Sequence, residues 1–404
     1  MQNDRSASAP AELRKPPMAD VIAGDGAALS AELVAMREAL FPPISRKSLR
    51  QFSSIETAKL VGIADGYLRQ LSLSGKGPQP SISTGGRRSY TLDQINELRV
   101  ALEEGSKGKR YVPRRNSGEH CQVLAVVNFK GGSGKTTTAA HLAQYLALHG
   151  YRVLAVDLDP QASLTALHGY QPEYDIHANQ TMYAAVRYDS ERKRLSDIIR
   201  KTYFPGLDLV PGNLELMEYE HDTPRALAER DAEPFFGRVA SALGSVSEQY
   251  DVMVLDCPPQ LGFLTLGALC AATGLLITVH PQMLDVMSMC QFLLMASDIL
   301  KVVQESGGDL DYDFIRYVVT RFEPVDAPQT QMVAFMRSLF RERVLNSTMV
   351  KSTAVSDAGL SKQTLYEVGR ENFSKQTYDR AVESLDAVNG EIEQLISAAW
   401  GRVS

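Results

Sequence analysis

The stretch that decides the fold is Lys130–Thr137, which consists of KGGSGKTT. Glycines at this spacing let backbone N–H groups approach nucleotide phosphates that side chains would obstruct. In such a loop Lys135 reaches the β- and γ-phosphates, and the Thr136 hydroxyl is placed to bind Mg²⁺. The spacing departs from the general G-x-x-x-x-G-K-[ST] pattern and fits the narrower K-G-G-x-G-K-T-[TS], which adds a second lysine, Lys130.

The residues on either side of the loop support this interpretation. Val123–Asn128 is an apolar run of strand length, typical of a strand buried on both faces. After the loop, apolar residues recur at helical spacing until Gly150, a suitable residue to end a helix. Strand, glycine-rich loop and helix is the context that a phosphate-binding loop requires, and it disfavours a glycine-rich turn with incidental lysines.

Carboxylates follow two further predicted strands. The segment YRVLAVD ends at Asp157 and is followed by Asp159, and the segment DVMVLD ends at Asp256. The carboxyl ends of parallel strands face the ligand crevice of an open α/β sheet. We therefore predict that Asp256 acts at Mg²⁺, directly or through water, and that Asp159 orients the attacking water. The alternative, that such residues only cap the next helix, stays open for the division of roles between Asp157 and Asp159.

Three ordered motifs, KGGSGKTT, VDLDPQASLT and VMVLDCPP, together resemble those of the ParA/MinD class of deviant Walker ATPases. The resemblance extends from Cys121 to the C-terminus. It implies an ATP-sandwich homodimer in which Lys130 reaches the phosphates of the second subunit, where two facing nucleotides concentrate negative charge. It also implies catalytic roles for Lys130, Lys135 and Asp159, and a magnesium site at Thr136 and Asp256. The implied nucleotide-binding residues are Lys130, Gly131, Gly132, Ser133, Gly134, Lys135, Thr136 and Thr137, the last at the α-phosphate.

Composition predicts a cytoplasmic protein of two or more domains. The chain has 404 residues, 44% of them apolar, which allows a large core. We find no transmembrane-length apolar stretch with suitable flanks and no signal peptide at the start of the sequence. The four cysteines show no metal-binding spacing and are expected to be isolated thiols in a reducing compartment.

Charge is unevenly distributed along the chain. Residues 41–120 hold 14 Lys and Arg against 7 Asp and Glu, a balance of +7, whereas the whole chain carries −6. A basic segment thus precedes an acidic one. A basic balance often marks only a solvated face, but here it coincides with a recognisable pattern.

That pattern lies between Ser53 and Leu98. The segment SIETAKLVGI, whose Gly62 supplies a tight turn, and the short helix ADGYLRQLSLSG are arranged as in a helix-turn-helix. Leu68 and Leu71 of the second are expected to point inward. A predicted hairpin with Gly85 and Gly86 near its tip and a helix capped by Thr91 follow. The whole resembles the winged helix-turn-helix of MerR-type regulators. By that resemblance the DNA-binding residues are Tyr67, Arg69 and Gln70 at the groove and Arg87 and Arg88 at phosphates. A small helical protein-interaction domain is the alternative.

The predicted fold is α/β. A P-loop NTPase domain with a mostly parallel, doubly wound sheet follows a winged helix-turn-helix domain and an N-terminal helix. The predicted boundaries are 1–44, with an amphipathic helix over 27–41; 45–104, the winged domain; 105–119, a linker; and 120–404, the ATPase domain. The helix is expected to dimerise the chain or to pack on the winged domain. Later basic residues are candidates for nonspecific DNA binding, although solvated helix charge is the default account: Arg337, Arg341, Arg343 and Lys351.

Within the class, the winged segment and TRFEPVDAPQTQMVAFMRSLF resemble the RepA subfamily, the ParA-type partition proteins of repABC plasmids. The C-terminus is more acidic than basic and so lacks the membrane-binding helix of MinD-like members. The resemblance implies a slow, partner-stimulated ATPase that uses ATP, ADP and Mg²⁺, binds operator and nonspecific DNA, and responds to a ParB-type partner, RepB. A nucleoid-associated partition protein that represses its own operon is the expectation. The alternative is a nucleotide-sensing transcriptional repressor without a partition role.

Overall fold

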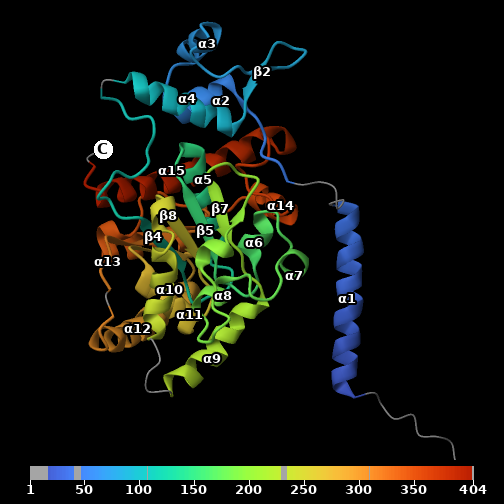
Figure 1. Ribbon diagram of the computed structural model, residues 1–404, viewed down its shortest axis with the longest axis vertical. Helices are drawn as coiled ribbons and strands as arrows, with labels where there is room; N and C mark the ends of the chain where they lie inside the picture. The colour runs from blue at the N-terminus through green and yellow to red at the C-terminus, as the bar shows by residue number, and fades with distance from the viewer. Residues whose placement is uncertain (1–16, 41–46, 107, 229–233, 309, 403–404) are drawn as a thin grey trace, which may run out of the picture. The chain divides into compact units, whose positions relative to one another are not determined.

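A computed structural model describes residues 17–40, 47–106, 108–228, 234–308 and 310–402 (Figure 1). The chain divides into two compact units, residues 1–47 and 48–404, and each is considered by itself. The first contains helix α1, Met18–Leu40. It begins nine residues before the predicted helix, and the predicted last residue, Phe41, lies outside the described residues. The described side chains of α1, which are those of residues 18–32 and Ala35, are all exposed. The expected role of this helix in dimerisation stays a prediction.

The second unit begins with a small subdomain of three helices and a three-stranded antiparallel sheet. Its helices are α2 (Ser54–Val61), α3 (Asp65–Leu73) and α4 (Leu92–Gly105). Its strands β1 (Phe52–Ser53), β2 (Ser81–Ile82) and β3 (Arg88–Tyr90) lie in the order β1-β3-β2. The predicted pair of helices, hairpin and following helix are therefore present.

Local signals in the sequence explain these elements. Ser53 with Glu56 forms a capping box that starts α2, and Thr91 with Gln94 forms another that starts α4. Gly62 adopts a left-handed conformation (φ 73°) that ends α2 and turns the chain into α3, a geometry that favours glycine.

The rest of the unit is built on a seven-stranded sheet in the order β10-β9-β4-β8-β5-β7-β6, parallel except for the pairing of β6 with β7. The mostly parallel sheet predicted from the sequence is confirmed. The strands span Gln122–Val127 (β4), Val153–Asp157 (β5), Arg200–Lys201 (β6), Leu207–Val210 (β7), Val252–Asp256 (β8), Gly274–Val279 (β9) and Phe314–Val319 (β10).

Helices connect the strands and cover both faces of the sheet (Figure 1). The α-helices are α5 (Lys135–His149), α6 (Ser163–Leu167), α7 (Pro172–Asp175), α8 (Met182–Val186), α9 (Met217–Leu227), α10 (Phe235–Gly244), α11 (Phe263–Ala271), α12 (Met283–Glu305), α13 (Ala327–Phe340), α14 (Thr353–Leu360) and α15 (Lys375–Ala399). Short 3-10 helices lie at Leu195–Asp197, Leu214–Leu216, Ser247–Gln249, Arg341–Arg343 and Arg370–Asn372.

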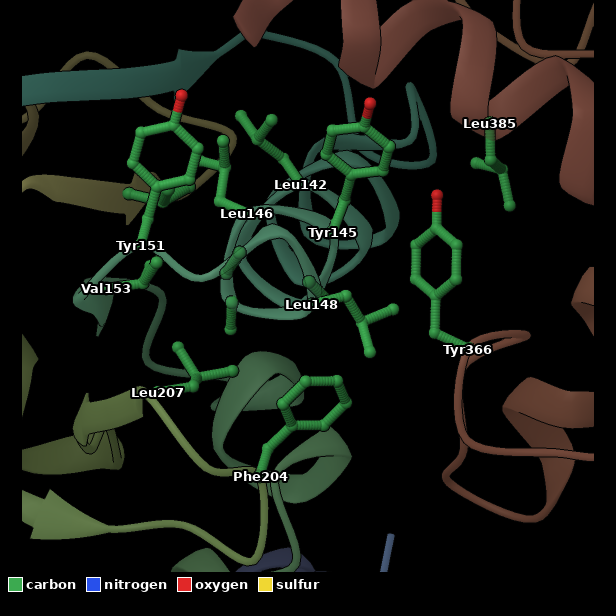
Figure 2. Packing of buried hydrophobic residues seen from close by; sticks show 14 of the residues in the cluster. Leu142, Tyr145, Leu146, Leu148, Tyr151, Val153, Phe204, Leu207, Tyr366 and Leu385 are labelled. Atoms are coloured by element: carbon green, nitrogen blue, oxygen red, sulfur yellow. The ribbon is translucent and has the colours of Figure 1, made fainter. Parts of the chain in front are cut away.

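Alternate residues of each strand supply two separate apolar cores. Leu124 and Val126 of β4 point to one face and Val123 and Ala125 to the other, as the period of two in a strand requires. On the first face α5 packs against α15, and Figure 2 shows α5 side chains beside Tyr366 and Leu385. Because the strands are buried on both faces, their sequences are continuously apolar rather than alternating.

A buried arginine joins the small subdomain to the helix that follows the phosphate-binding loop. Arg99 of α4 is 2% exposed, and its Nη2 donates to the carbonyl of Leu148 near the end of α5 (2.5 Å) and to that of Leu60 near the end of α2 (3.0 Å). Burial lowers its pKa to about 10, so it remains a cation, which suits the C-terminal ends of two helices. The core on this face is continuous across the two parts.

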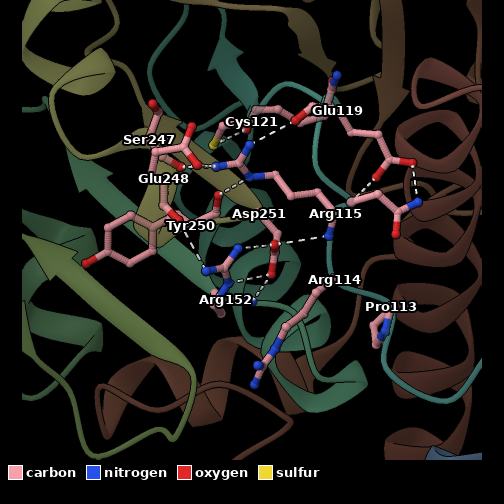
Figure 3. Close-up of polar contacts among 12 residues, drawn as sticks. Pro113, Arg114, Arg115, Glu119, Cys121, Arg152, Ser247, Glu248, Tyr250 and Asp251 are labelled. Atoms are coloured by element: carbon pink, nitrogen blue, oxygen red, sulfur yellow. Dashed lines mark hydrogen bonds and ion pairs between the residues drawn. The ribbon is translucent and has the colours of Figure 1, made fainter. Parts of the chain in front are cut away.

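The predicted linker, 105–119, is tied to the ATPase part at several points (Figure 3). The guanidinium of Arg115 donates to the carbonyls of Tyr250 and Ser247, and its backbone N–H donates to Asp251. Arg402 donates to the carbonyls of Pro113 and Arg114 from the other side. Where it is described, this segment is therefore an extended strap held by the domain that follows it.

Helix α12 is long and apolar enough to be compared with the expectation that the chain has no transmembrane-length apolar stretch with suitable flanks. By length and composition alone it is the one such helix in the described part of the chain, with 23 residues and a mean hydropathy of 1.6 over its best window. Buried positions such as Met289, Phe292 and Ala296 recur at helical spacing, as in a helix that packs one face on a core.

Candidate nucleotide site

The loop between β4 and α5 has the shape of a phosphate cradle. Gly132 (φ 75°) and Gly134 (φ 88°) both adopt left-handed conformations. A Cβ atom at Gly134 would approach the Thr320 side chain to 3.3 Å, so both the conformation and the space favour glycine there. The helix that starts at Lys135 directs its free N–H groups back into the loop.

Neighbouring strand ends hold the loop in this shape. The Thr320 hydroxyl, after β10, donates to the carbonyl of Ser133 (2.7 Å). The Ser133 hydroxyl lies 3.1 Å from that of Thr278 in β9, and the side chain of Asn128 donates to the Thr278 carbonyl. The backbone N–H of Lys130 in turn donates to Asn128. Hydrogen bonds from residues at the ends of β4, β9 and β10 therefore hold the phosphate cradle in its shape.

The two lysines of the loop have different surroundings. Lys135 is buried, and its Nζ donates to the carbonyl of Lys130 (3.1 Å). Burial lowers the pKa of Lys135, against the opposing influence of Asp256 and Asp159. Lys130 extends the other way, and its Nζ forms an ion pair of 2.6 Å with Asp285 in the first turn of α12. No motif in the sequence points to this partner, which lies 155 residues further along the chain.

The predicted metal residues meet at the carboxyl end of β8. Asp256 is fully buried, and neither of its carboxylate oxygens has a hydrogen-bond partner of ordinary geometry among the described residues. The Thr136 hydroxyl is close enough to lower the pKa of Asp256, but burial and the nearby Asp157 raise that pKa well above its usual value. An orphaned buried carboxylate beside a hydroxyl is a donor set that suits Mg²⁺.

Asp157 and Asp159 occupy different environments. The carboxylate of Asp157 accepts the backbone N–H of Thr165 (2.8 Å) and its hydroxyl (2.6 Å), which anchors α6. Asp159 is partly exposed and lines the same cavity as the glycine-rich loop, while one of its oxygens accepts from Gln161 N–H (2.9 Å). Asp157 is therefore engaged with the first turn of α6, whereas Asp159 lines the cavity.

The cavity over the loop measures about 650 Å³, a size typical of ligand sites. Its lining includes Gly131, Gly132, Gly134 and Lys135–Thr137 of the predicted set, whereas Lys130 points to Asp285 and Ser133 is buried beneath the loop. A cavity of about 730 Å³ lies at the opposite, amino edge of the strands, where the charges of Arg115 and Arg152 are paired with Asp251 and Glu248. The smaller cavity is the one at the strand ends where parallel sheets bind ligands.

Sequence reasoning missed one wall of this cavity. It consists of Arg321 and the segment around α14, from Met349 to Gly359. Arg321 has a left-handed backbone (φ 52°), and its guanidinium donates to the Gly132 carbonyl (3.1 Å). Lys351, predicted as a DNA candidate, lies here too and pairs with Glu323 (2.9 Å). The contact between Arg321 and Gly132 joins residues 189 positions apart, and the sequence motifs carry no sign of it.

The predicted DNA residues lie on the small subdomain. Tyr67, Arg69 and Gln70 are all exposed on α3, while Leu68 and Leu71 are buried as predicted. Arg87 is exposed next to the hairpin tip. Arg88 is half-buried, and its Nη1 has no partner among the described residues.

The other basic candidates cluster at the end of α13, apart from Lys351. Arg337 donates to the Asn346 carbonyl (2.6 Å). Arg343 lies over the Phe340 ring, 5.8 Å from its centroid.

Comparison with known proteins places these observations in a context. Residues 121–306 match the AAA domain family. The chain is 56% identical over 388 residues to a putative replication protein A of Sinorhizobium fredii, with 95% of each chain covered. It is 30% identical over 368 residues to protein SopA of Escherichia coli K12, covering 89% of this chain and 92% of SopA.

Solved structures are similar over different parts of the chain. A partition protein aligns with a TM-score of 0.63 over 92% of this chain and 98% of its own; at 19% identity this shows the fold alone. A cobyrinic acid a,c-diamide synthase from Mycobacterium smegmatis, with bound ADP and magnesium, aligns with a TM-score of 0.50 at 26% identity, over 60% of this chain and 91% of its own.

Proposed function

The chain belongs to the ParA/MinD-type P-loop ATPases, and on that premise we propose that it is a plasmid-partition ATPase that dimerises on ATP and binds DNA. The observation that carries the proposal is the loop itself, with Lys135, Thr136 and Asp159 around one cavity and Lys130 directed away from it. Relatives that align over nearly the whole chain include SopA, and a solved partition protein shares the fold.

ATP and ADP would bind with their phosphates in the cradle formed by the loop and the N-terminus of α5. The loop N–H groups and Lys135 would hold the phosphates, and Thr137 would contact the α-phosphate. Thr136 and Asp256 would hold Mg²⁺, which offsets phosphate charge when it is bound. This set fits the metal because Asp256 is otherwise a buried carboxylate without a hydrogen-bond partner among the described residues.

Hydrolysis would depend on Asp159 and on a second subunit. Asp159 would orient the attacking water, since it faces the cavity while Asp157 is engaged with α6. Lys130 would cross to the nucleotide of the partner copy and neutralise charge between the facing phosphates. Turnover would be slow in the isolated chain and stimulated by a ParB-type protein, RepB, bound at the plasmid centromere.

DNA binding would use two surfaces. The exposed face of α3 with Arg87 would bind the operator, so that the chain represses its own operon. The ATP dimer would bind DNA without sequence preference, through basic residues such as Arg337, Arg341 and Arg343 at the end of α13. Such a protein is expected in the cytoplasm and on the nucleoid.

The proposal is tested with the full chain by measuring nonspecific DNA binding with ATP, with ADP and without nucleotide, at several salt concentrations. Binding should require ATP and weaken steeply with salt, because it rests on phosphate contacts. Operator binding by an Arg69→Ala variant should fall while its ATP-dependent nonspecific binding persists. ATP-independent nonspecific binding would contradict the proposed cycle.

A repressor that only senses nucleotide is the second candidate. It is favoured by Arg99, which connects the small subdomain to the end of α5, the helix that starts in the loop. Plasmid maintenance by an Asp159→Ala variant separates the two, since only partition requires hydrolysis.

A further inference from the structure

The Lys130–Asp285 ion pair is the starting observation. Asp285 is buried, with 5% of its side chain exposed, whereas 41% of the Lys130 side chain is exposed. The amino group of Lys130 lies 2.6 Å from the Asp285 carboxylate. A buried carboxylate requires a partner, and among the described residues Lys130 is the only cation that forms an ion pair with it.

This pairing has a consequence for the second subunit. If Lys130 is to reach a nucleotide of another copy, its amino group must exchange the Asp285 carboxylate for phosphate oxygens. The exposed side of the lysine makes that exchange accessible from outside. Asp285 lies in the first turn of α12, where the helix dipole stabilises a carboxylate that has lost its cation.

A second observation concerns the surface around the pair. Met283, Leu284 and Met287, in the first two turns of α12, are 63%, 72% and 57% exposed. Large apolar side chains exposed in a group mark a surface that another molecule covers. Met283, Leu284 and Met287 lie on either side of Asp285 in sequence, and Asp285 pairs with Lys130. A second copy that receives Lys130 would therefore contact this surface.

We propose that Asp285 is a positioning residue that holds Lys130 within its own subunit, and that a second copy of the chain docks on the first two turns of α12 as the lysine is exchanged. The inference rests on the proposed function, because it requires Lys130 to act in the other subunit. It adds the surface on which the copies meet and the counter-ion that the dimer must displace.

The test measures the ATP-dependent part of self-association of the full chain by sedimentation velocity, with Mg²⁺ and either ATP or ADP. Asp285→Asn removes the charge at constant size, so Lys130 is no longer retained, and association should reach half-saturation at about tenfold lower protein concentration. The gain should vanish in a Lys130→Ala background, as a double-mutant cycle requires. Unchanged or weaker association of a folded Asp285→Asn chain overturns the role of Asp285.

The docking surface is tested by a matched pair of variants on the same helix. Leu284→Lys places a charge on the proposed surface and should abolish ATP-dependent association. Leu294→Lys places it at a similarly exposed position (65%), about 15 Å further along the helix, and should leave association as in the parent. Equal behaviour of the two variants overturns the assignment to the first two turns.

The remaining arms separate the causes of failure. Should Asp285→Asn not fold, as judged by its melting temperature, Asp285→Ser takes its place; if neither folds, the Leu284 and Leu294 variants decide. Lys130→Ala that associates with ATP like the parent refutes the proposed action of the lysine in the other subunit. Loss of association in Lys130→Ala, without a gain in Asp285→Asn, refutes only the inference about Asp285.

Discussion

Asp157 and Asp256 are register partners on the adjacent parallel strands β5 and β8, and both side chains are fully buried. Burial raises the pKa of Asp157 to about 7, and burial together with Asp157 raises the pKa of Asp256 well above its usual value of 3.8. The two carboxylates therefore resist ionising together unless a cation joins them.

The first prediction concerns pH. A raised pKa means that the folded chain keeps a proton that the unfolded chain loses near pH 3.8. The contribution of these two carboxylates to stability is therefore fully present below pH 3.8 and is lost as the pH rises, for Asp157 through about 7. Without nucleotide and Mg²⁺, the parent should therefore lose stability relative to Asp256→Asn between pH 4 and 8. Denaturant unfolding at each pH measures this, and parallel pH profiles would contradict it.

The same pair predicts the pH dependence of binding. Mg²⁺ requires deprotonated Asp256, whose pKa lies well above its usual value, so Mg²⁺-dependent ATP affinity should weaken as the pH falls. Calorimetric titration with ATP, with and without Mg²⁺, measures the difference.

Gly134→Ala should damage both stability and nucleotide binding. The backbone at φ 88° and the approach to Thr320 oppose a Cβ atom, so we expect a loss of about 1 to 2 kcal/mol and much weaker ATP binding. Gly237→Ala is the control, because Gly237 lies inside α10, away from this cavity, with nothing within 4 Å of the added atom. A stable, ATP-binding Gly134→Ala chain would mean that the loop is less constrained than its geometry indicates.

The two lysines of the loop should fail in different ways. Lys135→Ala removes a buried cation next to the phosphates and should weaken ATP binding about 100-fold. Lys130→Ala should spare most binding to the monomer and block the ATP-dependent dimer. Fluorescent-nucleotide titration and sedimentation distinguish the two effects, and normal ATP hydrolysis by Lys130→Ala would contradict its role in the second subunit.

Asp159→Ala should bind ATP and dimerise while hydrolysing ATP at least about 100-fold more slowly, because water orientation is lost. Phosphate release measures hydrolysis, and a plasmid-loss assay measures the consequence. Stable inheritance of the plasmid with this variant would sink the partition role and favour the nucleotide-sensing repressor.

Arg99→Met should destabilise the second unit by about 2 kcal/mol, since the carbonyls of Leu148 and Leu60 lose their shared donor. Thermal unfolding measures this, and the exposed Arg69→Met is the control with little expected change. Equal melting temperatures for the two variants would show that the buried contacts contribute nothing net.

The sequence predicted those parts of the molecule that local signals determine. Apolar runs predicted strands β4, β5 and β8 of the sheet, and capping residues such as Thr91 predicted helix starts. It also predicted which aspartates lie at the strand ends. The sequence did not predict contacts between distant residues, such as Lys130 with Asp285 and Arg321 with Gly132. Such contacts leave no periodic pattern and no characteristic spacing in the sequence. The left-handed backbone of Arg321 is likewise imposed by its surroundings, because arginine has no preference for it.

The strap at residues 105–119 and the buried Arg99 together determine how the chain can be divided. A fragment that begins at residue 120 would expose apolar surface of the shared core, lose the donor to the end of α5 and leave Asp251 without the N–H of Arg115. The change from a basic to an acidic composition near residue 120 is therefore not a suitable place to cut the chain for expression or domain exchange. The small subdomain and the ATPase part would have to be inherited, transplanted or deleted as a single piece.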